Sequence, residues 1–133
     1  MARSLIIETT FLIDLERERH RDSPGPATRF LEQNPRDELV ITETVAGEMA
    51  CGVPPSGIAR LEKLLAPFGV LAMTRAVALQ YGRIYRYLSD QGLLIGSNDL
   101  WIAAAALTYV VPVVTADADH YRRVPDLEVL SYR

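Results

Sequence analysis

The sequence predicts an α/β domain, a three-layer α/β/α sandwich in which a mainly parallel sheet lies between two layers of helices. Two observations lead to this prediction. Short apolar runs rich in β-branched residues alternate with longer segments of helical periodicity, and loop signals separate them. The chain has 133 residues, of which 49% are hydrophobic, so it is long enough for a proper core. We therefore expect residues 1–133 to form one domain.

The predicted strands are short apolar runs, several of which end at polar or acidic residues. A run that is apolar on both faces is typical of a parallel strand covered by helices on both sides. The segment 110–115 is the expected central strand, apart from Pro112 near its start. The predicted strands are 4–7, 38–42, 69–72, 110–115 and 127–130.

The predicted helices follow from apolar spacing and from end signals. Thr74 is a candidate N-cap for the most regular helix, and Gly92 is a fitting C-terminal stop. Segment 100–109 is apolar nearly all round, which predicts a buried helix. The other predicted helices are 10–19, 27–33, 43–51 and 58–65, and the clearest loop signal is the Ser-Pro-Gly-Pro run at 23–26.

Composition narrows the class of protein. The net charge of −3 argues against gripping nucleic acid by bulk electrostatics, but it leaves room for a nuclease whose metal ion handles the phosphate. The single cysteine, Cys51, allows no internal disulfide, so a cytoplasmic location is the default. Cys51 lies at the end of an apolar helix, where we expect its side chain to pack against other residues. His20 and His120 have no cysteine companions, so we do not expect a zinc site.

Four acidic residues stand near the ends of apolar segments: Glu8, Glu48, Asp99 and Asp117. Carboxylates repel one another, so a fold that brings several together usually has a cation to justify it. An all-oxygen set suits Mg²⁺ or Mn²⁺ better than zinc. The functional hypothesis rests on these four positions lying close together.

The expected topology can bring them together. In open parallel sheets, ligands bind beyond the carboxyl ends of the strands, where the strand order reverses. If the strands that precede Glu8 and Asp117 are neighbours at this point, both acids face one crevice. Glu48 lies about one turn into the helix after the second strand. Asp99 falls in the first turn of the buried helix, where the helix dipole favours an anion.

Each acid also has a purely structural interpretation. Asp99 could be an ordinary first-turn acid, and Glu48 could be exposed on the outer side of its helix. Asp117 could serve the hydrogen bonds of its own turn. Glu8 suits such a role least, because an acid that ends a buried strand needs a partner. These alternatives stay open for each position taken alone.

Four segments carry a resemblance to a known family: 5–15, 41–52, 96–104 and 114–125. The last contains Val-Thr-Ala-Asp followed by His-Tyr and Val-Pro. Together they make the chain similar, over nearly its whole length, to the PIN-domain ribonucleases. The similarity is greatest to the VapC-type toxins of bacterial toxin–antitoxin pairs.

The resemblance implies a metal site that is also the catalytic site, formed by Glu8, Glu48, Asp99 and Asp117. Hydroxyl hydrogen bonds from Thr9 and Thr115 would support it. Asp119 could help to position a metal or water, or could be a surface turn acid. The implied activity is endonucleolytic RNA cleavage that depends on Mg²⁺ or Mn²⁺. The implied partners are RNA, a VapB-type antitoxin that occludes the site, and a second copy in a homodimer.

One position departs from the family pattern, which has Asp where this chain has Glu8. The extra methylene displaces the carboxylate, and Mg²⁺ demands near-ideal octahedral geometry. With Glu at position 8, three outcomes are open: a fully active enzyme, a protein that binds metal but reacts slowly, or an inactive protein. We expect metal binding to be retained. The alternative function is a PIN-fold binding module with weakened or lost catalysis. A phosphatase or receiver domain is disfavoured, because no Asp-x-Asp follows the first strand.

Arginines near predicted helix ends have two interpretations. They could steer the RNA backbone, or they could simply be solvated. They are Arg17, Arg19, Arg122 and Arg123.

Overall fold

A five-stranded parallel sheet forms the middle layer of the computed structural model, which describes residues 2–133. The strand order is β3-β2-β1-β4-β5, and every neighbouring pair is parallel. The strands are β1 Ser4–Ile7, β2 Glu38–Thr42, β3 Gly69–Leu71, β4 Val113–Thr115 and β5 Val129–Ser131. The predicted parallel sheet is therefore confirmed.

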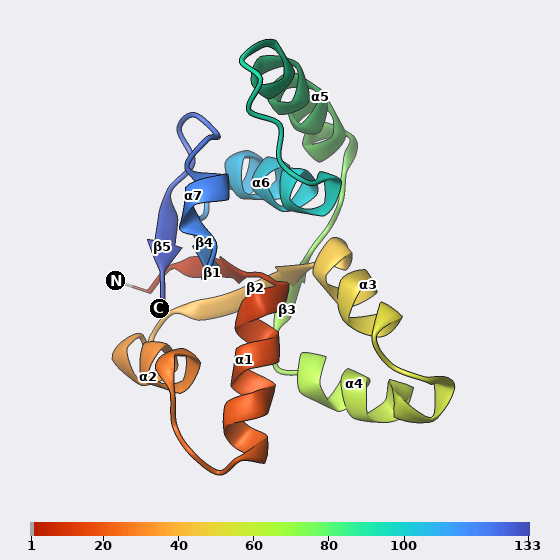
Figure 1. The fold of residues 1–133 in the computed structure, drawn as a ribbon, viewed down its shortest axis with the longest axis vertical. Coiled ribbons are helices and arrows are strands. Elements are labelled where there is room, and N and C mark those ends of the chain that lie inside the picture. The colour runs from red at the N-terminus through yellow and green to blue at the C-terminus, as the bar shows by residue number, and fades with distance from the viewer. Residues whose placement is uncertain (1) are drawn as a thin grey trace.

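Helices cover both faces of this sheet. In Figure 1, α5 and α6 lie on one side, and α1, α2 and α4 lie on the other. Helix α3 contacts α4 and α1 as well as α6. The helices are α1 Thr9–His20, α2 Pro26–Gln33, α3 Glu43–Cys51, α4 Ile58–Leu65, α5 Arg75–Asp90, α6 Ser97–Tyr109 and α7 Ala118–Tyr121, with a 3₁₀ turn at Pro55–Gly57. This is the predicted three-layer architecture. Among residues 2–133, no helix has both the length and the apolar character that crossing a membrane requires.

The strand order reverses at β1. Ile6 pairs with Val40 of β2 on one side and with Val113 of β4 on the other. From β1 the chain moves outward through β2 and β3, then returns through α5 and α6 to β4. The carboxyl ends of β1 and β4 therefore lie side by side at the topological switch point, where parallel sheets bind their ligands.

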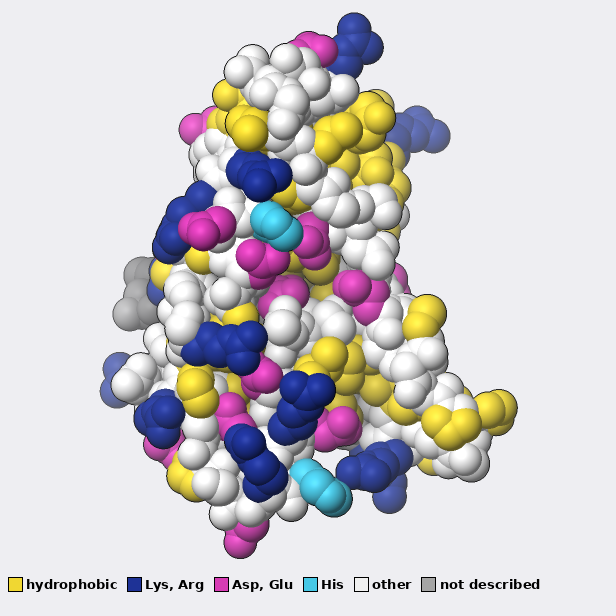
Figure 2. Space-filling view, viewed as in Figure 1, with side chains coloured by type: hydrophobic (Ala, Val, Ile, Leu, Met, Phe, Trp, Pro, Cys, Tyr) yellow, Lys and Arg dark blue, Asp and Glu magenta, His cyan; other side chains and the backbone are white. Residues whose placement is uncertain are grey.

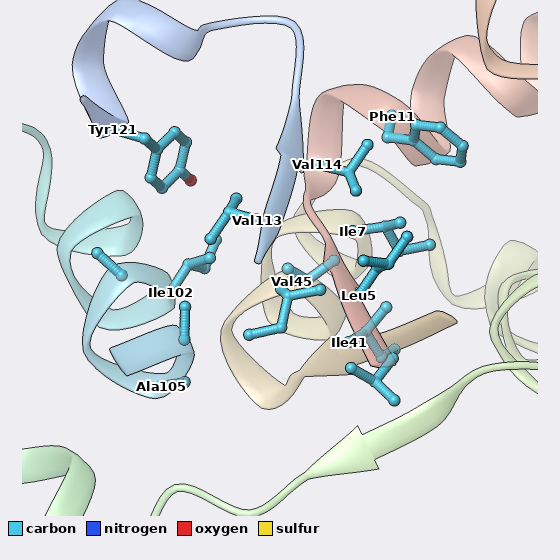
Figure 3. Packing of buried hydrophobic residues seen from close by; sticks show 14 of the residues in the cluster. Leu5, Ile7, Phe11, Ile41, Val45, Ile102, Ala105, Val113, Val114 and Tyr121 are labelled. Carbon is cyan, nitrogen blue, oxygen red and sulfur yellow. The ribbon is translucent and has the colours of Figure 1, made fainter. Parts of the chain in front are cut away.

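The core lies on both faces of β1 and β4. All of 5–7 is fully buried, as are Val113 and Val114. Figure 3 shows side chains of β1, β4 and α6 meeting in this region. The buried stretch 102–106 of α6 is Ile-Ala-Ala-Ala-Ala, and such small side chains let a helix lie close to a sheet. This confirms the predicted buried helix and places its N-terminus near the carboxyl ends of the strands.

The bounds of two elements differ most from the prediction. The fourth strand begins at Val113 rather than Val110. Val110 has a left-handed backbone (φ 56°) that ends α6, its side chain is 86% exposed, and Pro112 cannot donate a ladder hydrogen bond. Helix α6 begins at Ser97, one turn earlier than predicted. The apolar pattern did not reveal this turn, because its residues are polar.

The remaining differences are smaller. The last strand spans Val129–Ser131 instead of 127–130, and the short helix α7 was not predicted. Four residues are too few to display a helical period. Cys51 is exposed, so the expectation that it packs was wrong. It ends α3 at a point where the chain leaves the core.

A buried glutamate joins α1 to α2. The Glu18 carboxylate accepts hydrogen bonds from the backbone N–H groups of Gly25 (2.9 Å), Ala27 (3.0 Å) and Thr28 (2.9 Å). These N–H groups belong to the first turn of α2 and have no partner within the helix. A Cβ at position 25 would lie 2.7 Å from Glu18 Cδ, so a larger residue there would push the Glu18 carboxylate away from these hydrogen bonds. Burial alone would raise the pKa of Glu18, but the hydrogen bonds outweigh it and the pKa lies below its ordinary value.

Replacing Glu18 should destabilise the protein. We expect Glu18→Ala to lower the free energy of unfolding by about 3 kcal/mol at pH 7, because buried N–H groups lose a charged acceptor. The contribution of a carboxylate with a lowered pKa is present above its ordinary pKa of about 4.3 and is lost as the pH falls through the lower folded-state value. Urea unfolding at pH 7 and pH 3 should therefore give a smaller difference at pH 3. The control is Glu32→Ala, at an exposed position of α2, and an equal loss in both variants would contradict the assignment.

Candidate metal centre

The four predicted acids lie around the carboxyl ends of β1 and β4. Glu8 is the N-cap of α1, and Asp117 directly precedes α7. Asp99 lies in the first turn of α6, and Glu48 lies within α3. Asp99 is the central member of the group, because its charge acts on Glu8 and it is itself acted on by Glu48 and Asp117. Figure 2 shows acidic side chains gathered around a histidine on one face.

Glu8 is the most deeply buried of these acids. Its side chain is 5% exposed, and its Oε1 accepts hydrogen bonds from the hydroxyls of Thr10 and Thr115. The Thr115 contact, of 3.3 Å, joins the end of β4 to the end of β1. Thr115 also accepts a hydrogen bond of 2.9 Å from the backbone N–H of Asp117. The Thr115 hydroxyl therefore links two of the four acidic positions.

Glu48 reaches the site from α3. Its Oε1 accepts a hydrogen bond of 2.8 Å from the Thr9 hydroxyl. Thr9 and Thr10 are consecutive in the first turn of α1, yet they bond to different glutamates. The start of α1 thus fixes two carboxylates at once, and Glu48 faces the site from a partly buried position.

Asp99 is held from the side of α7. Its Oδ1 accepts a hydrogen bond of 3.1 Å from the hydroxyl of Tyr121, which is almost fully buried. Its Oδ2 lies 4.0 Å from His120 Nδ1. Three of the four carboxylates, those of Glu8, Glu48 and Asp99, therefore have one oxygen engaged by a hydroxyl.

Asp117 faces a histidine instead of a hydroxyl. His120 Nδ1 lies 2.7 Å from Asp117 Oδ2, one helical turn away. The separation is short, but this buried nitrogen has no hydrogen-bond partner of acceptable geometry. We therefore treat the contact as electrostatic. A protonated His120 would place a positive charge beside Asp117 and Asp99.

Burial and mutual repulsion raise the pKa of two of the acids. For Glu8, burial is the main cause and the charge of Asp99 adds to it, while the hydroxyls of Thr10 and Thr115 partly offset them. For Asp99, burial again leads, and Glu48 and Asp117 add repulsion that Tyr121 and His120 partly offset. A bound cation would relieve both effects.

The donor set fits a hard divalent cation. Four carboxylates supply only oxygen ligands, which suits Mg²⁺ or Mn²⁺. The raised pKa values of Glu8 and Asp99, caused first by burial and then by repulsion, show that the protein stabilises these two charges only in part. Within residues 2–133, however, no three His, Cys, Asp or Glu side chains stand in an arrangement that would hold one ion. Each carboxylate is instead in contact with a partner of its own. Holding an ion would require side-chain rotation toward a common centre.

Asp119 does not join this group. Its side chain is 97% exposed and contacts Arg122 at 3.8 Å. Arg123 donates to the carbonyls of Leu93 and Leu94, so it ties down the loop before α6. The Arg17 side chain lines a cavity of about 380 Å³ between α1 and α4.

Three residues of the site were not assigned a role from sequence: Thr10, His120 and Tyr121. The signal for Thr10 was its position two residues after Glu8, which suits a local hydrogen bond. The signal for His120 was its spacing of three from Asp117, which requires a helical turn there. Tyr121 carried no local signal, because its partner lies 22 residues away.

Comparison with known proteins gives a consistent family. The sequence profile of the PIN domain matches residues 5–127. The ribonuclease VapC of Rickettsia bellii (strain RML369-C) is 32% identical over 135 residues, covering 96% of this chain and 95% of that protein. The ribonuclease VapC1 of Haemophilus influenzae (strain R2866) is 30% identical over 128 residues, with 92% and 93% covered.

Solved structures agree with the fold. VapBC-1 from nontypeable Haemophilus influenzae contains a chain with a TM-score of 0.77 and 29% identity, covering 99% of this chain and 98% of that one. VapBC2 from Rickettsia felis, bound to a DNA fragment from its promoter, gives a TM-score of 0.81 at 22% identity, with 96% and 98% covered. The second likeness concerns the fold alone.

Removing one charge should stabilise the metal-free protein. We expect Asp99→Asn to unfold at a higher temperature than the wild type at pH 7 in EDTA, because a neutral amide escapes burial cost and repulsion but can still accept from Tyr121. The raised pKa of Asp99 also means that this difference should shrink as the pH falls and the wild-type carboxyl becomes protonated. For a chain of this size, a rise of about 3 °C corresponds to about 1 kcal/mol. A lower melting temperature at pH 7 would contradict this account.

Proposed function

Because this chain belongs to the PIN-domain family, and within it to the VapC-type proteins, we propose that it is a ribonuclease that acts as the toxin of a toxin–antitoxin pair. The observation that carries the proposal is the group of four carboxylates centred on Asp99 at the switch point of the sheet. The names of the relatives support the activity. The geometry supports metal-dependent chemistry, because a concentration of negative charge is what holds a divalent cation.

The proposed site residues are Glu8, Glu48, Asp99 and Asp117, which would hold Mg²⁺ or Mn²⁺. When bound, such an ion supplies a Lewis acid for the phosphodiester and lowers the pKa of a water nucleophile. The chain's own contribution is to gather the ligands at one edge of the sheet. The Thr9 hydroxyl holds Glu48, and the hydroxyls of Thr10 and Thr115 hold Glu8, near the carboxyl ends of β1 and β4.

The substrate that we propose is RNA, approached along a cationic surface. Arg17, His20, Arg21 and Arg60 line the cavity of about 380 Å³ beside Glu16. Figure 2 shows Lys and Arg side chains on the same face as the acidic group. Such a surface would bind the phosphate backbone and compensate for the overall charge of −3. Of the four arginines considered from sequence, Arg17 lines this cavity, and Arg19 lines a neighbouring one of about 340 Å³ with Arg60 and Lys63.

The proposed protein partners are a VapB-type antitoxin and a second copy of the chain. The similar structures from Haemophilus influenzae and Rickettsia felis are of VapBC pairs. Helix α5 exposes Leu79 and Tyr87, which lie about two turns apart on one side of the helix, and exposed apolar side chains of this kind are common at protein interfaces. We therefore propose that the toxin dimerises and is inhibited by its antitoxin.

One observation favours the second candidate, a PIN-fold module with weakened catalysis. The resemblance noted in the sequence implies Asp at position 8, and the longer Glu8 side chain of this protein is buried against Thr10 and Thr115. A carboxylate held in this way would have to turn to reach an ion. RNA cleavage with and without Mn²⁺ separates the two candidates.

Metal binding and cleavage should both depend on Asp99. We expect calorimetry to detect Mn²⁺ binding by the wild type, and at least about tenfold weaker binding by Asp99→Asn, a difference of about 1.4 kcal/mol. A structured RNA should be cut by the wild type only when Mn²⁺ is added. The matched control is Asp119→Asn, at an exposed acid outside the group, which should behave as the wild type. Equal binding by all three proteins, or none by any, would refute the metal site, and binding without cleavage would favour the second candidate.

A shorter side chain at position 8 should be tolerated. We expect Glu8→Asp to maintain or raise the initial rate of Mn²⁺-dependent RNA cleavage, because it restores the residue that the family has at this position. Glu43→Asp, at an exposed position of α3, controls for the effect of the same substitution elsewhere. A sharp loss of rate confined to Glu8→Asp would mean that the site is adapted to glutamate.

A further inference from the structure

We propose that Tyr121 is a positioning residue for Asp99, whose hydroxyl holds one carboxylate oxygen so that the other is presented to the divalent cation. The inference rests on the proposed function, because it concerns the same site.

Packing fixes the position of the Tyr121 hydroxyl. The side chain is 1% exposed and belongs to the main hydrophobic cluster. Figure 3 shows its ring beside α6 and β4, near Ile102 and Val113. A ring enclosed in this way cannot swing freely, so its hydroxyl is a fixed point from which to orient a neighbouring group.

The contact engages one side of the Asp99 carboxylate. Tyr121 donates to Oδ1 at 3.1 Å, while Oδ2 points toward His120 Nδ1, 4.0 Å away. That same nitrogen lies 2.7 Å from Asp117 Oδ2, so Asp99 Oδ2 is on the side of Asp117, another of the four acids. Anchoring Oδ1 therefore sets the direction in which Oδ2 meets an incoming cation.

The Tyr121 hydroxyl is the donor in this contact, because an ionised carboxylate can only accept a hydrogen bond. Partners of metal ligands fix ligand orientation in this manner, and losing one typically lowers metal affinity 10–100-fold. The hydrogen bond also links α7 to the first turn of α6, two elements that the sequence separates.

The test is Tyr121→Phe, which keeps the packed ring and removes only the hydroxyl. The matched control is Tyr132→Phe, because the Tyr132 hydroxyl also donates to an aspartate, at 2.6 Å, but that aspartate is Asp14, outside the four acids. We expect calorimetry to give about tenfold weaker Mn²⁺ binding for Tyr121→Phe and unchanged binding for Tyr132→Phe. RNA cleavage by Tyr121→Phe should fall at limiting Mn²⁺ and recover at saturating Mn²⁺.

A double-mutant cycle tests whether Tyr121 acts through Asp99. In the Asp99→Asn background, adding Tyr121→Phe should weaken Mn²⁺ binding by less than it does in the wild type. An undiminished additional loss would overturn the positioning role, as would wild-type affinity in Tyr121→Phe or equal losses in the two tyrosine variants. In each of these cases, Mn²⁺ binding by the wild type would leave the proposed function intact. No Mn²⁺ binding by the wild type would instead refute the proposed function, and this inference with it.

Discussion

Burial of the carboxylates around Asp99, together with their mutual repulsion, is the constraint on which the surrounding structure depends. Each acid is drawn to a partner of its own: Glu48 to Thr9, Glu8 to Thr10 and Thr115, Asp99 to Tyr121, and Asp117 to His120. These partners reduce the cost of placing the charges together, but they do not cancel it, because the pKa values of Glu8 and Asp99 stay raised. The uncompensated charge is the property that a divalent cation would use.

The sheet explains why the acids meet. Parallel strands end at one edge, and the reversal of strand order places the end of β4 beside the end of β1. Helix α6 then brings its first turn, with Asp99, to the same edge, and its alanines allow the close approach. The apolar core thus has a functional consequence, because it determines how near to one another the charged groups are held.

Two buried glutamates illustrate how environment separates structural from chemical roles. Glu18 accepts three backbone N–H groups at the start of α2, and its pKa lies below the ordinary value. Glu8 is bonded to neutral hydroxyls and faces another carboxylate, and its pKa is raised. The first is fully satisfied within the chain. The second is stabilised only in part, which is consistent with the metal-ligand role proposed for Glu8.

The sequence by itself determined most of the elements and identified the four acids. Runs of β-branched residues marked β1 and β2, and Thr74 marked the start of α5, because these signals are local. Only the tertiary structure decided which partner each acid has, since the Thr115–Glu8 hydrogen bond spans 107 residues. Local signals also did not reveal the left-handed backbone of Val110, because of which β4 begins later than predicted. Nor did they reveal the one-turn helix α7, which carries His120 and Tyr121. Hydrogen bonds between distant residues depend on how the layers pack, and no local pattern contains that information.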